Sequence, residues 1–189
     1  MSEPKRGFIL HSRDGAPEAS QPFLDQVEQG FGFIPNIFRV FAESPAATEA
    51  YLSLNNILRN KTAFTAQEQE VLLLAISVTN DCGYCVAAHT GSAERAKLDP
   101  EIIESLRGGK ALPDSKLNAL ATFACALIEK RGWVSDDDVQ AFLDAGYTRQ
   151  HLLDALVALS MKTISNYTNH LADTPLDEAL QPKALKKAS

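Results

Sequence analysis

Apolar residues recur along most of this chain at the three- and four-residue spacing that places them on one side of an α-helix. The stretches 45–60 and 113–130 are clear examples. Their apolar positions are Leu52, Leu54, Ile57 and Leu58 in the first, and Leu117, Leu120, Ala121, Ala124 and Leu127 in the second. No stretch between turn signals alternates as a strand does, and glycine and proline fall at the ends of the helical stretches. The pattern therefore predicts an all-α fold.

Local capping signals indicate where the helices begin. Ser44 precedes Pro45, which suits an N-cap followed by proline at the first helical position. Thr65 and Glu68 have the spacing of a capping box, in which each side chain bonds the backbone N–H of the other residue. Helices are expected over about 22–29, 45–60, 65–78, 100–107, 113–130, 135–145 and 148–170, with one more helix after residue 78 that is capped by Asn80 or Asp81.

The chain has 189 residues, which suits a single domain. Residues 1–20 contain proline and glycine and little periodicity, so they are expected to form an extended N-terminal arm. Residues 21–189 are then expected to form one compact all-α domain. Near its start, Phe31, Phe33 and Phe38 are expected to pack in the core or at an interface rather than to line a substrate site.

Composition and charge argue against several classes of protein. The net charge is -6 and the isoelectric point is about 5.2, which argues against nucleic acid or an anionic membrane as the main partner. The longest apolar run near the middle, residues 71–76, is far shorter than the roughly 20 residues that cross a bilayer. The first residues do not lead into the apolar segment of a signal peptide, so a cytoplasmic protein is expected. In a reducing compartment, a close cysteine pair predicts redox or metal chemistry rather than a disulfide scaffold.

Candidate chemistry is concentrated at Cys82, Cys85 and His89. Residues three and four apart are neighbours on a helix surface, so these three side chains are expected to form one stripe. A thiol beside an imidazole is the arrangement that produces thiolate at neutral pH, and a second thiol within reach allows a disulfide to close. The sequence therefore predicts a redox-active dithiol.

Two effects compete in choosing the attacking thiol. The unpaired N–H groups at the helix start favour a thiolate at Cys82, whereas the imidazole of His89 favours Cys85. Because the imidazole can also remove a proton, Cys85 is the expected nucleophile, with Cys82 the more exposed, resolving thiol. If the chain reverses near residue 80, Glu70 reaches the depth of His89 and is expected to orient it, with a pKa raised by burial.

The same residues allow other interpretations. A zinc site would need four ligands, and only three candidate side chains lie close together. The cysteines could instead be small buried hydrophobes, and Glu70 could be a surface residue. Cys125 lies among Phe123, Ala124 and Leu127 and is expected to pack in the core.

The pattern Glu70, eleven residues, Cys82-x-x-Cys85, three residues and His89 resembles the core motif of the alkylhydroperoxidase D family, within the carboxymuconolactone decarboxylase-like superfamily. This core covers about residues 45–110. The chain also resembles a longer subgroup, usually called "peroxidase-related". This second resemblance rests on segments before and after the core, which are Phe33-Ile34-Pro35-Asn36, Ser44-Pro45, Asn166-Tyr167-Thr168-Asn169-His170 and Thr174-Pro175-Leu176-Asp177.

The resemblance implies an all-α fold and a homo-oligomer, commonly a trimer or hexamer. It also implies that Cys85 is the peroxidatic thiol, Cys82 its disulfide partner, and His89 with Glu70 a proton relay. The best-studied branch has a histidine just before the second cysteine, and this chain has Tyr84 there. A phenol has an ordinary pKa of about 10 and transfers protons poorly at pH 7, so Tyr84 is expected to do no more than donate a hydrogen bond to an oxyanion or water.

These observations predict a thiol-dependent peroxidase that requires no metal, flavin or haem. A hydroperoxide would oxidise Cys85 to a sulfenic acid, Cys82 would close the disulfide, and an external dithiol (a lipoyl group or a thioredoxin-like protein) would reduce it. Two alternatives stay open, a dithiol adaptor or redox sensor with little peroxidase activity, and a binding protein with inert thiols. His151, Tyr167 and His170 are expected to pack rather than to line the pocket.

Overall fold

The structure is a computed structural model that describes residues 3–185. Within this range the chain forms α-helices, two short 3-10 helices and no β-strand, so the all-α prediction is confirmed. The elements are η1 (Glu18–Ser20), α1 (Gln21–Phe31), α2 (Asn36–Phe41), α3 (Pro45–Lys61), α4 (Ala66–Thr79), α5 (Gly83–Arg95), α6 (Pro100–Arg107), α7 (Ser115–Glu129), α8 (Asp136–Asp144), α9 (Arg149–Ala172) and η2 (Glu178–Lys183).

The capping signals in the sequence mark the starts of α3 and α4. Ser44 accepts a hydrogen bond from the backbone N–H of Ala47, and Thr65 and Glu68 form the expected capping box. The short helix α2 was not anticipated, because it has only six residues and follows Pro35, which provides no side-chain cap.

The expected cap of α5 is wrong. Neither Asn80 nor Asp81 caps this helix; Cys82 occupies the N-cap position and Gly83 begins the helix. The chain reverses at Asp81, one residue before this N-cap, because Asp81 adopts a left-handed φ of 52°. The backbone N–H of Cys82 then donates a hydrogen bond to the carbonyl oxygen of Ser77 at 2.9 Å. This tight reversal places the cysteine pair at the very start of α5.

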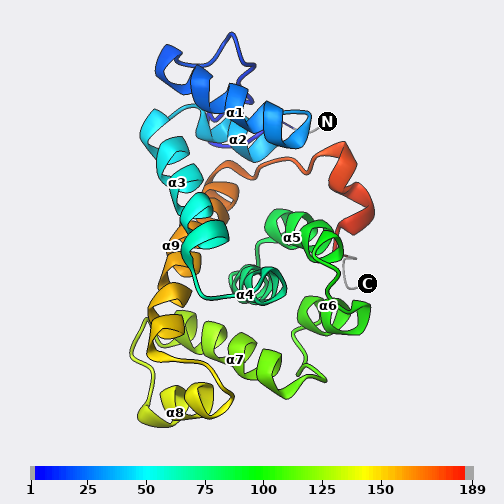
Figure 1. Cartoon of the computed structure of the whole chain (residues 1–189). Helices are drawn as coiled ribbons and strands as arrows, with labels where there is room; N and C mark the ends of the chain where they lie inside the picture. Colours follow the sequence, from blue (N-terminus) through cyan, green and yellow to red (C-terminus); the bar gives the residue numbers. More distant parts are fainter. Residues whose placement is uncertain (1–2, 186–189) are drawn as a thin grey trace.

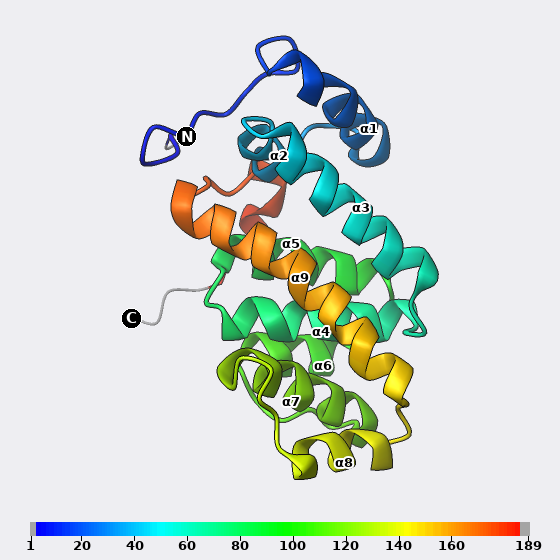
Figure 2. The ribbon, with the colours of Figure 1, turned by 90° about the vertical axis from the view of Figure 1, so that its left-hand side faces the viewer.

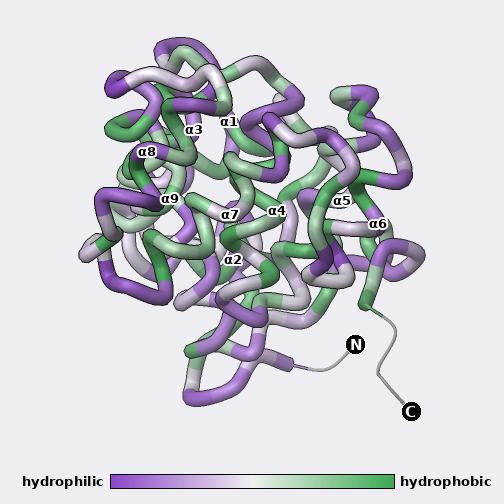
Figure 3. The backbone as a smooth tube through the Cα atoms, turned by 90° about the horizontal axis from the view of Figure 1, so that it is seen from below, coloured by the Kyte–Doolittle hydropathy of each residue, from purple (hydrophilic) through white to green (hydrophobic). Residues whose placement is uncertain are grey.

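Helix α4 lies at the centre of the molecule. Figure 1 looks along α4, with α5, α6, α7 and α9 around it, and Figure 2 shows α9 crossing in front of α4 and α5. Residues 71–76 of α4 are all buried, which is the behaviour of a helix that is apolar on every side. The hydrophobic segments in Figure 3 gather around α4 and α7.

The C-terminal end of the described chain packs against α5. In Figure 1 the segment 174–185, here called the C-terminal strap, returns from α9 and passes beside α5. It is attached to the N-terminal part through Asp177, which accepts a hydrogen bond from the backbone N–H of Asn36 at 2.9 Å. At its far end Lys183 pairs with Glu94 of α5 at 2.5 Å. The strap therefore closes one side of the region around the cysteines.

Among residues 3–185, no helix combines the length and the hydrophobicity that crossing a bilayer requires.

Candidate active site

Glu70 and His89 come together across the pair of helices α4 and α5. The reversal between these helices brings Oε2 of Glu70 to 3.2 Å from Nδ1 of His89. Glu70 is only 2% exposed, so it is not a surface residue. Its other oxygen, Oε1, lies 2.6 Å from Nη2 of Arg59 on α3. The carboxylate is thus held between an imidazole and a guanidinium.

The expectation of a raised Glu70 pKa is wrong. Burial alone would raise the pKa of this carboxyl, as the sequence argument assumed. The hydrogen bond from His89 and the positive charge of Arg59 outweigh burial and lower the pKa below its ordinary value. Glu70 is therefore an anion at neutral pH and orients His89 as a carboxylate, rather than supplying a proton.

The second nitrogen of His89 faces a buried lysine. Nζ of Lys162, on α9, lies 2.9 Å from Nε2 of His89, and Lys162 is 0% exposed. Burial and the positive charge of Lys162 lower the pKa of His89 against the opposing effect of Glu70. The imidazole is then neutral, and its two neighbours assign the tautomer: Nδ1–H donates to Glu70, and Nε2 accepts from the ammonium of Lys162.

The two sulfurs of the cysteine pair lie around a single amide nitrogen. Nδ2 of Asn169 on α9 is 3.2 Å from Sγ of Cys85 and 3.7 Å from Sγ of Cys82. Both cysteines are free thiols and both are buried, with Cys82 1% and Cys85 4% exposed. The expectation that Cys82 is the more exposed thiol is wrong, because the N-cap position of α5 packs against an apolar cluster that includes Phe38.

The two thiols differ in acidity. Burial alone would raise the pKa of Cys85, yet its pKa lies well below the ordinary value because the thiol of Cys82 donates a hydrogen bond to it and Lys162 places a positive charge beside it. The pKa of Cys82 is raised, because its S–H is the donor in that hydrogen bond and because it is buried. Cys85 is therefore the more acidic of the two thiols and the one favoured as a thiolate, whereas Cys82 is favoured as a protonated thiol.

The hydroxyl of Tyr84 forms its hydrogen bonds with groups other than the two sulfurs. It donates a hydrogen bond to Oδ2 of Asp177 in the C-terminal strap and accepts one from the backbone N–H of Ile37 at 3.2 Å. Burial and the negative charge of Asp177 raise the pKa of the phenol. The hydroxyl is thus not directed at an oxyanion; it links α5 to the strap and to α2.

A cavity of about 260 Å³ opens onto Cys85, His89 and Lys162. Much of its remaining lining is apolar, with the aromatic residues Phe31, Phe33, Phe38, Tyr51 and Tyr84 contributing to the wall. Phe38 is buried and Phe31 and Phe33 are exposed, and all three line the cavity, although the sequence analysis expected them to pack in the core or at an interface. The site therefore combines an acidic thiol with an apolar, aromatic chamber.

Four polar residues of this site were missed by sequence reasoning, namely Arg59, Lys162, Ser165 and Asn169. Three of them lie on α9 at positions 162, 165 and 169, a spacing that puts them on one helix face. The sequence did not single them out, because other polar residues such as Thr163, Asn166 and Thr168 lie between them on α9. His151, Tyr167 and His170 do not line the cavity; His151 instead packs edge-on against Phe64.

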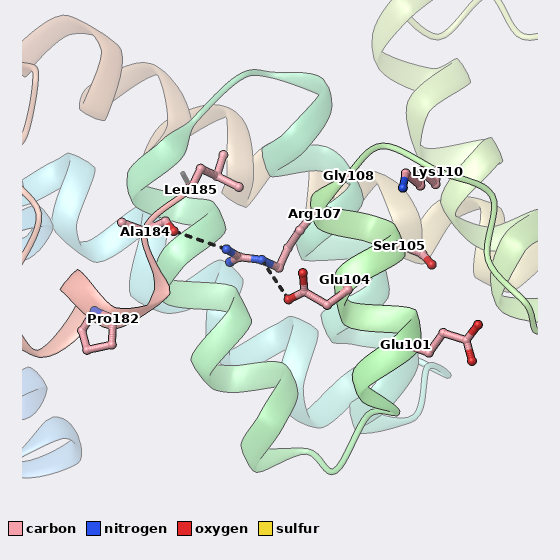
Figure 4. A pocket seen from close by; sticks show the side chains of 9 residues that line it. All are labelled: Glu101, Glu104, Ser105, Arg107, Gly108, Lys110, Pro182, Ala184 and Leu185. Atoms are coloured by element: carbon pink, nitrogen blue, oxygen red, sulfur yellow. Dashed lines mark hydrogen bonds and ion pairs between the residues drawn. The ribbon is translucent and has the colours of Figure 1, made fainter. Parts of the chain in front are cut away.

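A second hollow, of about 640 Å³, lies between α6 and the C-terminal strap (Figure 4). Its lining contains no thiol and no imidazole. Its arginine, Arg107, is already occupied, since it donates to the hydroxyl of Thr90 at 2.7 Å and to the carbonyl oxygen of Lys183 at 2.9 Å. Within residues 3–185, no group of three or more His, Cys, Asp or Glu side chains is arranged to hold a metal ion.

We expect the free energy of unfolding to fall as the pH drops below about 6.5, the ordinary pKa of histidine. Since His89 has a lowered pKa in the folded state, the unfolded chain binds more protons below that pH, and stability is lost on acidification. The lowered pKa of Glu70 adds a loss of the same sign at lower pH. Urea unfolding at several pH values measures this, and His89→Asn should flatten the dependence between pH 5 and 7; an unchanged slope would contradict it.

Part of the chain is similar to a known sequence family. Residues 45–126 match the sequence profile of the Carboxymuconolactone decarboxylase family, a range that contains Glu70, Cys82, Cys85 and His89. No curated protein matches the chain.

Solved structures share the fold along nearly the whole chain. A peroxidase-related protein with an alkylhydroperoxidase AhpD core, from Ralstonia eutropha JMP134, has a TM-score of 0.83 and 20% identity, covering 95% of each chain. A peroxidase-related protein from Silicibacter sp. TM1040 has a TM-score of 0.80 and 16% identity, again covering 95% of each chain. The debrominase Bmp8 in complex with 2,3,4-tribromopyrrole has a TM-score of 0.80 and 15% identity, covering 96% of this chain and 97% of that chain. At such identities these likenesses establish the fold and not the activity.

Proposed function

We propose that this protein is a thiol-dependent peroxidase acting on organic hydroperoxides. The proposal is supported by the match of residues 45–126 to the Carboxymuconolactone decarboxylase family and by the similarity of the fold to that of a peroxidase-related protein with an alkylhydroperoxidase AhpD core. The observation that carries the proposal is the acidic thiol of Cys85, which lines an apolar cavity and has a protonated thiol, Cys82, beside it. This is the pairing that a dithiol–disulfide cycle requires.

In the proposed reaction, the thiolate of Cys85 attacks the outer oxygen of the hydroperoxide. The S–O bond forms as the O–O bond breaks, giving a sulfenic acid on Cys85 and an alcohol. The sulfur of Cys82 then attacks the sulfur of Cys85, the disulfide closes, and water leaves. Asn169 supports the second step, because its amide holds both sulfurs within hydrogen-bonding distance of one nitrogen.

An external dithiol must complete the cycle by reducing the disulfide. Both sulfurs are buried, and Cys85 is reached through a cavity of about 260 Å³. A slender dithiol such as a lipoyl arm fits this access better than the broad surface of a thioredoxin-like protein. A cytoplasmic location, which would keep the resting thiols reduced, stays a prediction.

Mass spectrometry of the protein after one equivalent of tert-butyl hydroperoxide tests the proposal. The expected product is a disulfide between Cys82 and Cys85 with Cys125 unmodified, and a dithiol donor should restore the free thiols. Recovery of unmodified Cys82 and Cys85 after peroxide would refute peroxidase activity. Tyr84 supports the alternative of a disulfide-exchange adaptor, since its hydroxyl is bound to Asp177; fast exchange with a donor disulfide but no reaction with peroxide would favour that function.

The likeness to Bmp8 supports a second candidate reaction, reductive debromination of an aromatic compound. The aromatic wall of the cavity suits such a ring. The thiolate of Cys85 would take up the bromine, a proton would replace it on the ring, and Cys82 would displace bromide as the disulfide forms. Bromide release from 2,3,4-tribromopyrrole, in place of peroxide consumption, would favour this reaction.

We also propose a homo-oligomer, either a trimer or a hexamer. Leu153, Leu156, Tyr167 and Leu171 are exposed along α9, and a row of exposed apolar side chains on one helix is typical of a subunit interface. Sedimentation as a monomer at micromolar concentration would contradict the oligomer.

A further inference from the structure

Lys162 is a buried cation without a carboxylate partner. It is 0% exposed, and among residues 3–185 no carboxylate lies within ion-pair distance of its ammonium. A buried ammonium is costly unless hydrogen bonds and an opposite charge compensate it. Its hydrogen-bond partner Nε2 of His89, at 2.9 Å, is uncharged. Cys85 lines the same cavity, and the positive charge of Lys162 lowers its pKa, so the thiolate of Cys85 is the group that supplies the compensating negative charge.

We propose that Lys162 is the proton donor of this site, giving a proton from its ammonium to the oxygen that leaves when Cys85 attacks the hydroperoxide. The inference rests on the proposed peroxidase function and assigns a step within it. Its support is geometric: Lys162 lines the same cavity as Cys85 and His89, so a substrate oxygen released beside Cys85 lies next to the ammonium.

Three other polar groups of the cavity are unsuited to this role. Nε2 of His89 carries a lone pair directed at Lys162 and has no proton to give. The hydroxyl of Tyr84 is bound to Asp177. Arg59 is engaged with Glu70 and is effectively always protonated, so it does not act as an acid.

Over a full catalytic cycle, Lys162 gives up one proton and regains it. The O–O bond breaks with its electron pair on the alkoxide oxygen, which takes a proton from Lys162 and leaves as the alcohol, so Lys162 becomes a neutral amine. Cys82 loses its proton as it attacks the sulfenic acid of Cys85, and hydroxide departs with that proton as water. When an external dithiol reduces the disulfide, its two protons return to Cys82 and Cys85, and Cys85 passes its proton to the amine of Lys162.

In this scheme Glu70 and His89 are positioning residues. Glu70 accepts from Nδ1–H of His89 and so fixes the tautomer whose Nε2 lone pair faces Lys162. That lone pair holds the ammonium at the cavity wall. The hydrogen bonds thus run from Glu70 through His89 to Lys162 of α9, and Lys162 alone moves a proton, whereas the sequence predicted a proton relay of Glu70 and His89.

The test uses two peroxides that differ in their leaving group. The alkoxide that leaves tert-butyl hydroperoxide is a strong base and needs a proton, whereas the acetate that leaves peracetic acid is a weak base and does not. Stopped-flow rates of Cys85 oxidation are measured for the full chain and for Lys162→Met, Lys162→Arg and the exposed control Lys97→Met. Each rate is divided by the thiolate fraction from ultraviolet titration, which removes the effect of Lys162 on thiol acidity.

With tert-butyl hydroperoxide, Lys162→Met should lower the rate per thiolate by about 10²-fold or more, the usual contribution of general acid catalysis. With peracetic acid its rate per thiolate should stay within a few-fold of the unaltered protein. Lys162→Arg should keep the thiolate but show the same selective loss, because it retains the charge and donates a proton poorly.

Equal losses with both peroxides, or no loss, would overturn the inference. Inactivity of the unaltered protein toward both would instead refute the proposed function, and Lys162→Arg reports on the role if Lys162→Met does not fold.

Discussion

Replacing Cys85 with serine should reduce hydroperoxide consumption by about 10³-fold or more, into the uncatalysed background, since the nucleophile itself is removed. Peroxide loss with tert-butyl hydroperoxide and dithiothreitol measures the effect. Cys82→Ser should differ in kind, because the thiolate of Cys85 remains: the first oxidation of Cys85 should persist, while the disulfide cannot form.

Cys125→Ser is the matched control for the loss of a thiol. Cys125 lies on α7, where its sulfur accepts a hydrogen bond from the hydroxyl of Thr79 at 3.1 Å, and it does not line the cavity. This variant should turn over peroxide at the rate of the unaltered protein. Equal activity in Cys85→Ser and Cys125→Ser would remove Cys85 from the reaction.

Replacing Glu70 with alanine should lower the free energy of unfolding by about 3 kcal/mol, the low end of the cost of breaking a buried ion pair. The substitution leaves His89 without its acceptor and Arg59 without its carboxylate. The low end applies because the side chain of Arg59 is 30% exposed and regains water. Urea unfolding at pH 7.5 measures the loss.

Two further variants serve as controls for the stability loss of Glu70→Ala. Glu70→Gln retains the volume and an acceptor oxygen for His89, so it should be destabilised by less than Glu70→Ala. Glu49→Ala, at an exposed position on α3, should change stability by no more than about 0.5 kcal/mol. If Glu70→Ala were as mild as Glu49→Ala, the buried carboxylate would not hold α3, α4 and α5 together.

The parts of the fold that follow local rules could be predicted from the sequence. The starts of α3 and α4 are encoded within a few residues, by Ser44-Pro45 and by the capping box of Thr65 and Glu68. The short helix α2 and the cap of α5 could not, because packing fixes them. Cys82 takes an N-cap position that its side chain does not stabilise, in a turn set by Asp81.

In the candidate site, too, contacts between neighbouring helices could be predicted, and contacts between distant parts of the chain could not. Glu70 and His89 are 19 residues apart on consecutive helices, so one helical reversal was enough to place them near each other. Lys162 is 73 residues from His89, and Asp177 is 93 residues from Tyr84. No periodicity within one helix encodes such distant pairs. The direction of the Glu70 pKa shift was misjudged because the local argument considered burial alone and left out the lowering effects of His89 and Arg59.

The order in which the chain is synthesised bears on when its sulfur becomes sensitive to oxidants. The ribosome releases Cys82 and Cys85 long before Lys162 and Asn169 of α9, which stabilise and surround the thiolate. A nascent chain that ends after α5 therefore lacks these partners of the cysteines. Under the proposed function, we expect sensitivity to peroxide to arise only once α9 has docked.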